Sequence, residues 1–462
     1  MSTTFPDSAE SSLFAHCIIS RLAAAVSTRH GCILTPSGDM VPILPCLVLL
    51  VAAGPPWVAG EGLQNILGGY VPKYGQCYES VPGEAGALNI GQRWGDPSPT
   101  ATLSIDPRTV TSATSYFDFR TFDPEGVIFY GDMSPGVNWF VLALRNGKPE
   151  IQIHNTVTNI TVSGGRRIND GQWHRIMAKN EGHAVLLAVD NNYQLKLDHV
   201  SEAIVEAPVF DMRIGVGGLL IPTEELLVPL NPAMDGCMRR WNWLNKSTEW
   251  MEGTSLEDKD AKVCFPNIRK GSFFPGNGLA TFSLSDLYTG AVSANQNWSL
   301  TVQLWMEAAP QSAPLLATSA FPLRLSLHRT HLMAHLGNKT VLQVPFPLGG
   351  CLNAPLHLTI TPSHTTLRLG NAETSKPTPK LDFESLQHTW LGKKGDFVVG
   401  GLPGQEKFPL AQERSFFRGC LRGFRVQDQV LDFDEVKSRS NSIWPYSCPV
   451  ADRGQAKADQ EA

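Results

Sequence analysis

The sequence predicts an all-β chain with two tandem antiparallel β-sandwiches of the jelly-roll type. The first observation is a motif of two glycines and two cysteines that occurs twice, at Gly217, Gly218, Cys237 and Cys264 and again at Gly400, Gly401, Cys420 and Cys448. The first glycine precedes the first cysteine by 20 residues in both copies, and the two cysteines lie 27 and 28 residues apart. A repeat of about 183 residues indicates two copies of one domain, each closed by a Cys237–Cys264 or Cys420–Cys448 disulfide.

The second observation is a regular series of short apolar runs separated by turn formers. In the first copy the expected strands are 127–130, 139–144, 150–154, 159–162, 173–178, 185–189 and 193–197. Between them lie turns that tolerate positive φ, at 145–147, 169–171 and 190–192. Strands at this spacing, with almost no helical periodicity, indicate antiparallel sandwiches.

These patterns divide the 462 residues into five parts. We expect a leader over 1–60, a Gly- and Pro-rich linker over 61–98, a first domain over 99–265, a second domain over 272–449 and a polar tail over 450–462. The uninterrupted core of the one strongly apolar run, Met40 to Gly60, is too short to span a bilayer, and its segment 41–54 is typical of a signal peptide. Translation from Met40, a long positive n-region with Arg21 and Arg29, and an internal anchor remain alternatives.

Cysteine usage agrees with a secreted protein. Removal of residues 1–60 leaves an even number of cysteines, with Cys77 and Cys351 either paired to each other or free. Four glycosylation sequons remain, at Asn159, Asn245, Asn297 and Asn338.

Several function classes are disfavoured. The net charge is −5 and no basic block occurs, so nucleic-acid binding lacks its phosphate-neutralising patch. The chain has no nucleophile elbow, zinc-protease motif or phosphate-binding glycine loop, so no enzyme activity is expected. His328, His331 and His335 follow an alternating run and are interpreted as strand and turn residues rather than metal ligands.

The turn Asp123-Pro-Glu-Gly126 is the one polar motif with a possible ligand. Its carboxylate, carbonyls and rigid proline suit a hard cation such as calcium, and they equally suit an ordinary turn. The second copy lacks this run near residues 307–310, so any calcium site is expected in the first copy alone.

Longer stretches resemble laminin G-like domains. The resemblance rests on 123–131, Asp170-Gly-Gln-Trp-His174, Asp235-Gly-Cys-Met-Arg239 and 397–401 with 418–423. As a tandem pair without Gla or EGF-like modules, the chain resembles the family of sex hormone-binding globulins as a divergent member. The resemblance covers about residues 98–450.

That resemblance implies a steroid site inside the first sandwich. A rigid apolar ligand needs a concave apolar pocket with a polar group at each end. The positions that match the family's steroid-binding residues are Ser115, Asn138, Phe140, Asn155, Asn180 and Met212. The resemblance places Ser115 at the A-ring oxygen and Asn155 near the D-ring hydroxyl, with Phe140 and Met212 as apolar walls.

Two of these positions depart from the family pattern. Asn138 replaces an aspartate that accepts a hydrogen bond from the steroid 17-hydroxyl, and Asn180 replaces a methionine. A neutral amide is a weaker acceptor than a carboxylate, and its NH₂ favours a 17-keto oxygen. We therefore expect weaker discrimination in favour of 17-hydroxyl androgens.

The resemblance also bears on metals. Zinc in some members is held by that aspartate and two histidines; the matching Asn138, Thr156 and Val209 are poor ligands, so no zinc site is expected. For calcium the matching donors are Asp123, Glu125 and Ala233, and in the family calcium supports a homodimer through the first domain.

Two functions remain. The leading hypothesis is a secreted carrier of androgens and estrogens; the alternative is an extracellular adhesion or receptor-ligand module that binds protein or glycan with calcium. An open pocket bordered by Ser115, Phe140, Asn155 and Met212 would favour the carrier, whereas an adhesion module would have that space filled.

Overall fold

The structure is a computed structural model. It describes residues 83–91, 94–106, 114–134, 136–181, 184–198, 211–243, 262–287, 298–319, 323–337, 339–346, 351–393, 395–402 and 416–450. The predicted leader and signal peptide, the polar tail beyond 450, Cys77, Val209 and the sequons at Asn245, Asn297 and Asn338 lie outside these residues. In the part of the chain that is described, no helix is long and apolar enough to cross a membrane.

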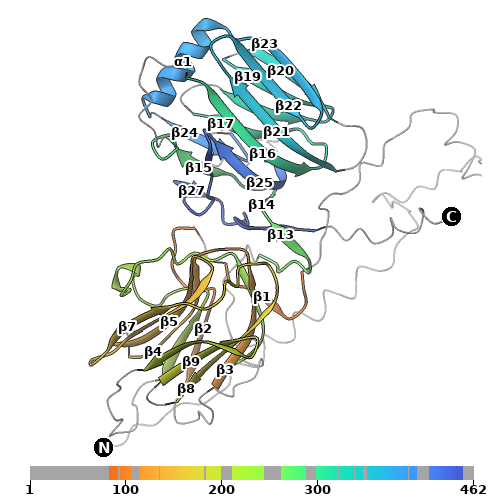
Figure 1. The fold of residues 1–462 in the computed structure, drawn as a ribbon. Helices are drawn as coiled ribbons and strands as arrows, with labels where there is room; N and C mark the ends of the chain where they lie inside the picture. The colour runs from red at the N-terminus through yellow and green to blue at the C-terminus, as the bar shows by residue number, and fades with distance from the viewer. Residues whose placement is uncertain are drawn as a thin grey trace, which may run out of the picture. The chain divides into compact units, whose positions relative to one another are not determined.

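Domain 1 is a sandwich of two six-stranded antiparallel sheets (Figure 1). The first, sheet A, has the order β1 (Ala87–Asn89), β12 (Gly236–Asn242), β3 (Thr114–Thr121), β8 (His174–Asn180), β9 (Ala184–Val189) and β10 (Asn192–Asp198). The second, sheet B, has the order β2 (Ala101–Ile105), β11 (Met212–Val216), β4 (Gly126–Ser134), β5 (Asn138–Arg145), β6 (Lys148–His154) and β7 (Asn159–Ser163). A short 3₁₀ helix, η3 (Thr223–Glu225), lies in the loop after β11.

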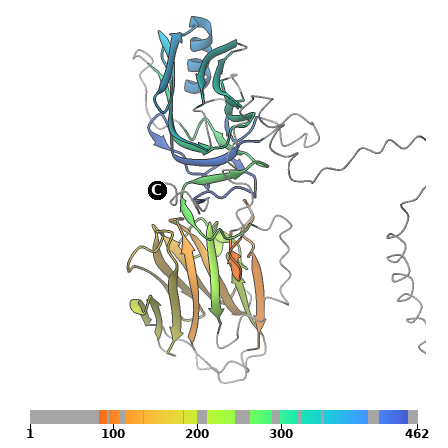
Figure 2. The same cartoon turned by 90° about the vertical axis from the view of Figure 1, so that its right-hand side faces the viewer.

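Domain 2 repeats this topology. Sheet E has the order β14 (Ser272–Pro275), β25 (Arg418–Val426), β16 (Leu300–Ala308), β21 (Leu352–Ile360), β22 (His364–Leu369) and β23 (Ala372–Pro377), with β26 (Gln429–Val430) beside β25. Sheet F has the order β20 (Lys339–Pro345), β19 (His331–Leu336), β18 (Arg324–His328), β17 (Ala313–Thr318), β24 (Asp396–Val399), β15 (Ala280–Ser283) and β27 (Ser438–Arg439). A separate ribbon pairs β13 (Ile268–Lys270) with β28 (Ser447–Pro449), and Figure 2 shows the layers from the side.

The seven strands expected in domain 1 are confirmed, and each differs from its prediction by only a few residues. The expected turns also adopt positive φ, for example at Asn146, Gly171 and Asp190. Both predicted disulfides are present. His328 and His331 form a register pair across the β18–β19 hairpin, which confirms the interpretation of that histidine cluster as strand and turn.

Two segments differ from the prediction. Residues 87–90, expected in the linker, belong to domain 1: β1 pairs with β12 and Ile90 is fully buried. The helix α1 (Lys380–Leu391) was not predicted, because the polar residues between its buried side chains Phe383, Leu386 and Trp390 weaken the apolar pattern.

The repeated glycine pair has a steric cause. Gly217 has φ +70°, and a Cβ there would lie 2.2 Å from the Ile90 carbonyl oxygen. Gly400 has φ +86°, and its Cβ would lie 2.6 Å from the Phe274 ring. Only glycine fits such positions, so this part of the repeat belongs to the fold.

Candidate functional site

One end of the domain 1 sandwich holds a cavity of about 260 Å³ between sheets A and B. That volume is close to the lower end of the roughly 300–1,000 Å³ usual for small-molecule sites. Sheet A contributes residues from β3, β8 and β9, and sheet B contributes residues from β4, β5, β6 and β11. All six positions predicted for steroid contact line this single cavity: Ser115, Asn138, Phe140, Asn155, Asn180 and Met212.

The wall of the cavity is largely apolar and aromatic. Phe129 lies edge-on to Trp243 with a centroid distance of 4.3 Å and lies 5.3 Å from Phe140. Ile153, Ala178 and Val185 complete the wall, and sequence analysis missed them together with Phe129 and Trp243. Alternation of side chains along each strand predicts which positions face inward. It does not separate the wall of a cavity from a filled core, so these residues could not be selected from the sequence.

Ser115 is the polar exception on the inner face of its strand. In β3 the side chains of Ser115, Phe117 and Phe119 alternate inward and are 3%, 1% and 0% exposed. A buried hydroxyl that borders a cavity is placed to bond with a polar group of a ligand.

Three asparagines also border the cavity, where the strands that line it begin or end. Asn138 begins β5, Asn155 follows β6 and Asn180 ends β8; Asn138 and Asn180 are exposed and Asn155 is half-buried. The Asn155 side-chain oxygen accepts backbone N–H bonds from Val157 at 2.9 Å and Thr158 at 2.6 Å. The oxygen of this asparagine is therefore already bonded within the turn that follows β6.

Asp132 also borders the cavity, but its carboxylate lies with Tyr130, whose ring packs outside the cavity wall against Trp139. The carboxylate accepts hydrogen bonds from the Tyr130 hydroxyl at 2.8 Å and from Arg213 Nε at 2.8 Å, with a second Arg213 nitrogen in contact. The hydrogen bond to Asp132 raises the pKa of Arg213. The pKa of Tyr130 is also raised, mainly by burial and secondly by its hydrogen bond to Asp132. Asp132 is thus committed to a protein network.

The counterpart of Ser115 in domain 2 is an apolar residue. The disulfide cysteines align the two copies, because Cys237 pairs with Arg120 of β3 and Cys420 pairs with Glu307 of β16. Ser115 lies five residues before Arg120, and Val302 lies five residues before Glu307. Val302 is therefore the counterpart of Ser115. The inward side chains of β16 are all apolar. Helix α1 adds Phe383, 5.5 Å from Trp298, together with buried Leu386 and Trp390.

The predicted calcium donors meet at the other end of domain 1. The Asp123 carboxylate is 1% exposed and accepts N–H bonds from Glu125 at 3.0 Å and Asp235 at 2.8 Å. Burial raises the pKa of the Asp123 carboxyl well above its ordinary value, although the two backbone donors oppose that shift.

Two further contacts bring the predicted donors together. The Glu125 carboxylate accepts the Asn231 N–H at 2.8 Å, and the Ala233 carbonyl oxygen lies 2.2 Å from where a Cβ on Gly126 would be. Within the described residues no three His, Cys, Asp or Glu side chains are grouped to hold a metal, so calcium here would depend on backbone carbonyls in addition to Asp123.

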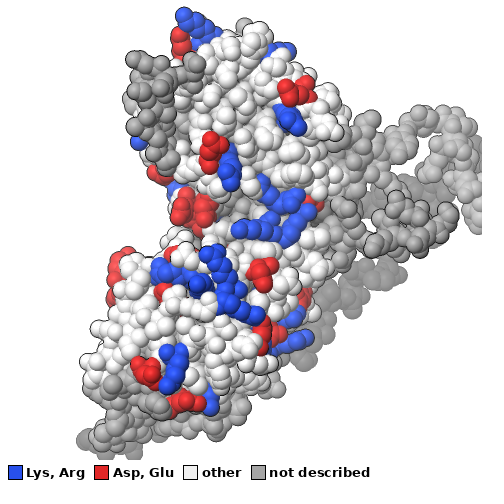
Figure 3. All heavy atoms as spheres, in the orientation of Figure 1, with Lys and Arg blue, Asp and Glu red and all other residues white. Residues whose placement is uncertain are grey.

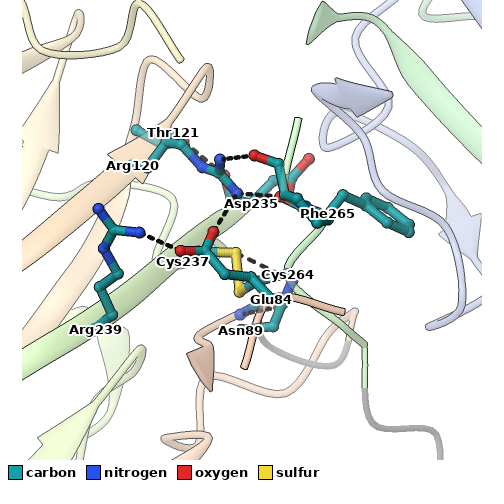
Figure 4. The surroundings of a disulfide bond; sticks show 11 residues. Glu84, Asn89, Arg120, Thr121, Asp235, Cys237, Arg239, Cys264 and Phe265 are labelled. Atoms are coloured by element: carbon teal, nitrogen blue, oxygen red, sulfur yellow. Dashed lines mark hydrogen bonds and ion pairs between the residues drawn. A yellow bond between two sulfur atoms is a disulfide. The ribbon is translucent and has the colours of Figure 1, made fainter. Parts of the chain in front are cut away.

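The Cys237–Cys264 disulfide lies in a tightly bonded setting (Figure 4). Arg120 donates to the carbonyl oxygens of Phe265 and Pro266, the latter at 2.9 Å. Glu84 pairs with both Arg120 and Arg239. The strand β3 therefore carries Ser115 in the cavity and Arg120 at the structural disulfide, five residues apart on one rigid element.

The chain resembles several known proteins. The laminin G domain family matches residues 119–249. The sex hormone-binding globulin of Crocuta crocuta is 38% identical over 353 residues, which cover 76% of this chain and 86% of that protein. The Homo sapiens protein of the same name is 38% identical over 355 residues, covering 76% and 84%.

Solved structures agree on the fold. Domains LG4-5 of the mouse laminin alpha1 chain match with a TM-score of 0.58 at 18% identity, covering 82% of this chain and 98% of theirs. The 38% identity to sex hormone-binding globulins over most of both chains, together with the laminin G fold, shows that this chain belongs to the sex hormone-binding globulin family.

Proposed function

We propose that this protein is a secreted, non-enzymatic carrier that binds sex steroids reversibly in the domain 1 cavity. The main support is that all six residues implied by the family resemblance line one apolar cavity, although they come from five different strands or their ends. The alternative of a purely adhesive module gains no comparable support, because that function needs no space between the sheets.

The chemistry of the cavity suits a rigid apolar ligand with an oxygen at each end. The Ser115 hydroxyl borders the cavity from sheet A, and the amides of Asn138 and Asn155 border it from β5 and the end of β6 in sheet B. Apolar burial supplies most of the affinity, and a nanomolar complex requires about 12 kcal/mol in total.

Equilibrium binding of tritiated dihydrotestosterone to the purified protein tests the proposal. We expect saturable binding at one site per chain. Ser115→Ala removes a donor to a buried ligand oxygen, which costs roughly 1–3 kcal/mol, or about 5- to 150-fold in affinity. Thr366→Ala, on the outer face of domain 2, is the matched hydroxyl control and should bind as wild type. Absence of saturable binding by the folded wild type would refute the carrier function.

A calcium ion bound by Asp123, Glu125 and Ala233 is part of this proposal, with a homodimer through domain 1 as its consequence. Its support is the convergence of the turn at Asp123–Gly126 with the segment at Asn231–Asp235. A cation would also favour the ionised form of a carboxyl that burial otherwise disfavours. Sedimentation before and after EDTA, with Asp123→Asn as the comparison, tests both the ion and the dimer.

A further inference from the structure

The last strand of sheet B has an unpaired edge. On one side β7 bonds to β6, in a register that runs from Asn159 opposite His154 to Ser163 opposite Glu150. No strand of the described residues pairs with the other side of β7. A free strand edge offers its N–H and C=O groups to a strand of another molecule, so natural proteins usually protect it.

Charge does not provide that protection for β7. The end strand of sheet A, β10, carries Lys196 and Asp198, which form an ion pair at 3.1 Å. The five residues of β7 include no charged residue and no proline, and its pairing with β6 has no bulge. The part of domain 1 where Figure 1 labels β7 is drawn largely in white in Figure 3, the colour of residues other than Lys, Arg, Asp and Glu. The edge of β7 therefore needs protection of another kind.

The first residue of β7 begins a glycosylation sequon. Asn159, Ile160 and Thr161 fit the pattern of asparagine, any residue except proline, and serine or threonine. Successive side chains of a strand lie on opposite faces of the sheet. Ile160 packs against the core of domain 1, so Asn159 and Thr161 lie together on the outer face of sheet B.

The amide nitrogen of Asn159 is accessible. The side chain is exposed, and its Oδ1 lies 2.5 Å from Nδ1 of His154, the residue directly across the β6–β7 pair. Because the oxygen faces His154, Nδ2 on the other side of the amide is directed away from that ring. A sugar on Nδ2 would extend into solvent without displacing a buried side chain, as N-linked glycans on folded proteins must.

Domain 2 has a sequon at the equivalent place. In sheet F the end strand is β20, beside β19, as β7 is the end strand of sheet B beside β6. Asn338, which lies outside the described residues, is followed directly by Lys339, the first residue of β20, and by Thr340. One sequon alone could arise by chance. Its recurrence at the start of the same end strand in both copies indicates a role that is tied to the strand.

We propose that Asn159 carries an N-linked glycan, and that this glycan keeps the free edge of β7 from pairing with a second copy of the chain. The proposal rests on secretion, which is part of the proposed function, because such glycans are added in the secretory pathway. The calcium-dependent homodimer proposed above would then use another surface of domain 1.

The modification joins two molecules in one step. Nδ2 of Asn159 forms a bond to the anomeric carbon of an oligosaccharide that is linked to a lipid pyrophosphate. The bond between that carbon and the phosphate oxygen breaks, the lipid pyrophosphate leaves with the electron pair, and Nδ2 loses one proton to solvent. The bulky, hydrated product at the start of β7 excludes an approaching strand.

Peptide mass spectrometry of the full chain secreted from mammalian cells tests the modification. Enzymatic removal of the glycan in isotope-labelled water should leave a labelled carboxyl at position 159. Thr161→Ala removes the sequon hydroxyl and should abolish the label, and Thr161→Ser keeps the sequon and should retain it. A secreted chain without label at Asn159 would overturn this proposal alone, whereas a chain retained inside the cell would overturn the secreted carrier and this proposal with it.

Sedimentation in EDTA, which removes the calcium-dependent dimer, tests the protection of the edge. Thr161→Ala should lower the Kd of self-association by about tenfold or more, because a pair of β7 strands gains several cross-strand contacts. Thr161→Ser should sediment as wild type. Thr161→Lys also removes the glycan but places a charge on the strand, so it should associate as weakly as wild type.

Neither Asn159 nor Thr161 lines the steroid cavity, so these variants should keep the melting temperature and the steroid binding of wild type. Self-association of Thr161→Ala no stronger than that of wild type would refute the protective role. Thr161→Lys associating as strongly as Thr161→Ala would also refute it, because the association would then not depend on a free strand edge.

Discussion

The substitution Asn138→Asp tests how the cavity selects the oxygen at the far end of its ligand. Asn138 is exposed at the rim, and Asp132, the one acidic residue that borders the cavity, has its carboxylate bonded to Tyr130 and Arg213. A steroid hydroxyl therefore meets amides rather than a carboxylate with spare acceptor capacity. Testosterone and androstenedione differ only in the hydroxyl or keto oxygen at this end, so their affinity ratio isolates the effect.

The expected magnitude follows from the hydrogen bonds that change. A bond to a charged acceptor contributes about 1 kcal/mol more than one to a neutral amide, at the lower end of the range because the rim is exposed to solvent. For a keto steroid, the substitution removes an NH₂ donor and places a negative charge near an acceptor, which costs about 1 kcal/mol more. The two changes together should move the testosterone to androstenedione affinity ratio by about 2 kcal/mol, or roughly thirtyfold.

Competition of each steroid against tritiated dihydrotestosterone measures the ratio. Asn371→Asp, in the exposed turn between β22 and β23, adds the same charge in domain 2 and should leave the ratio unchanged. An unchanged ratio in Asn138→Asp, with total binding intact, would show that this side chain does not face the ligand's terminal oxygen.

Three further outcomes are expected. Gly217→Ala should lower the free energy of unfolding by about 2–5 kcal/mol in thermal or urea denaturation, since it combines a strained φ with a backbone overlap. Gly423→Ala introduces the strained φ without an overlap and should lower it by about 1–2 kcal/mol. Equal losses in the two variants would contradict the steric account. EDTA should convert a dimer to monomers in sedimentation while Asp123→Asn stays monomeric with or without calcium, and a dimer that persists in EDTA would refute the calcium dependence. Cys420→Ala with Cys448→Ala should lower stability by about 3–4 kcal/mol, and a loss below about 1 kcal/mol would show that the 28-residue loop is ordered without its disulfide.

The strands and turns of domain 1 were predictable because their signals are local. A run such as 139–144 between turn residues has few alternatives, and Asn146 and Gly171 disclose positive φ by residue type. β1 was missed because three residues cannot form a pattern, and its place depends on β12, about 150 residues later. Helix α1 was missed because its side chains are buried by tertiary packing rather than by a strong local period.

The cavity residues illustrate a different limit. Phe140 and Met212 are ordinary inward positions of strands, and nothing local separates a cavity wall from a filled core. Ser115 and Asn155 carry no motif either. Only the family resemblance selected them, and the structure then brought them to one cavity, since strands distant in sequence become neighbours through sheet pairing.

Comparison of the two copies separates the requirements of the fold from those of function. Gly217 and Gly400 and the disulfides recur in both domains, so they belong to the sandwich itself. At the position of Ser115, domain 2 holds Val302, the choice that stability alone would favour. Domain 1 holds a polar group in an apolar wall there, at a cost to its own stability. A cost of this kind persists where selection acts on binding.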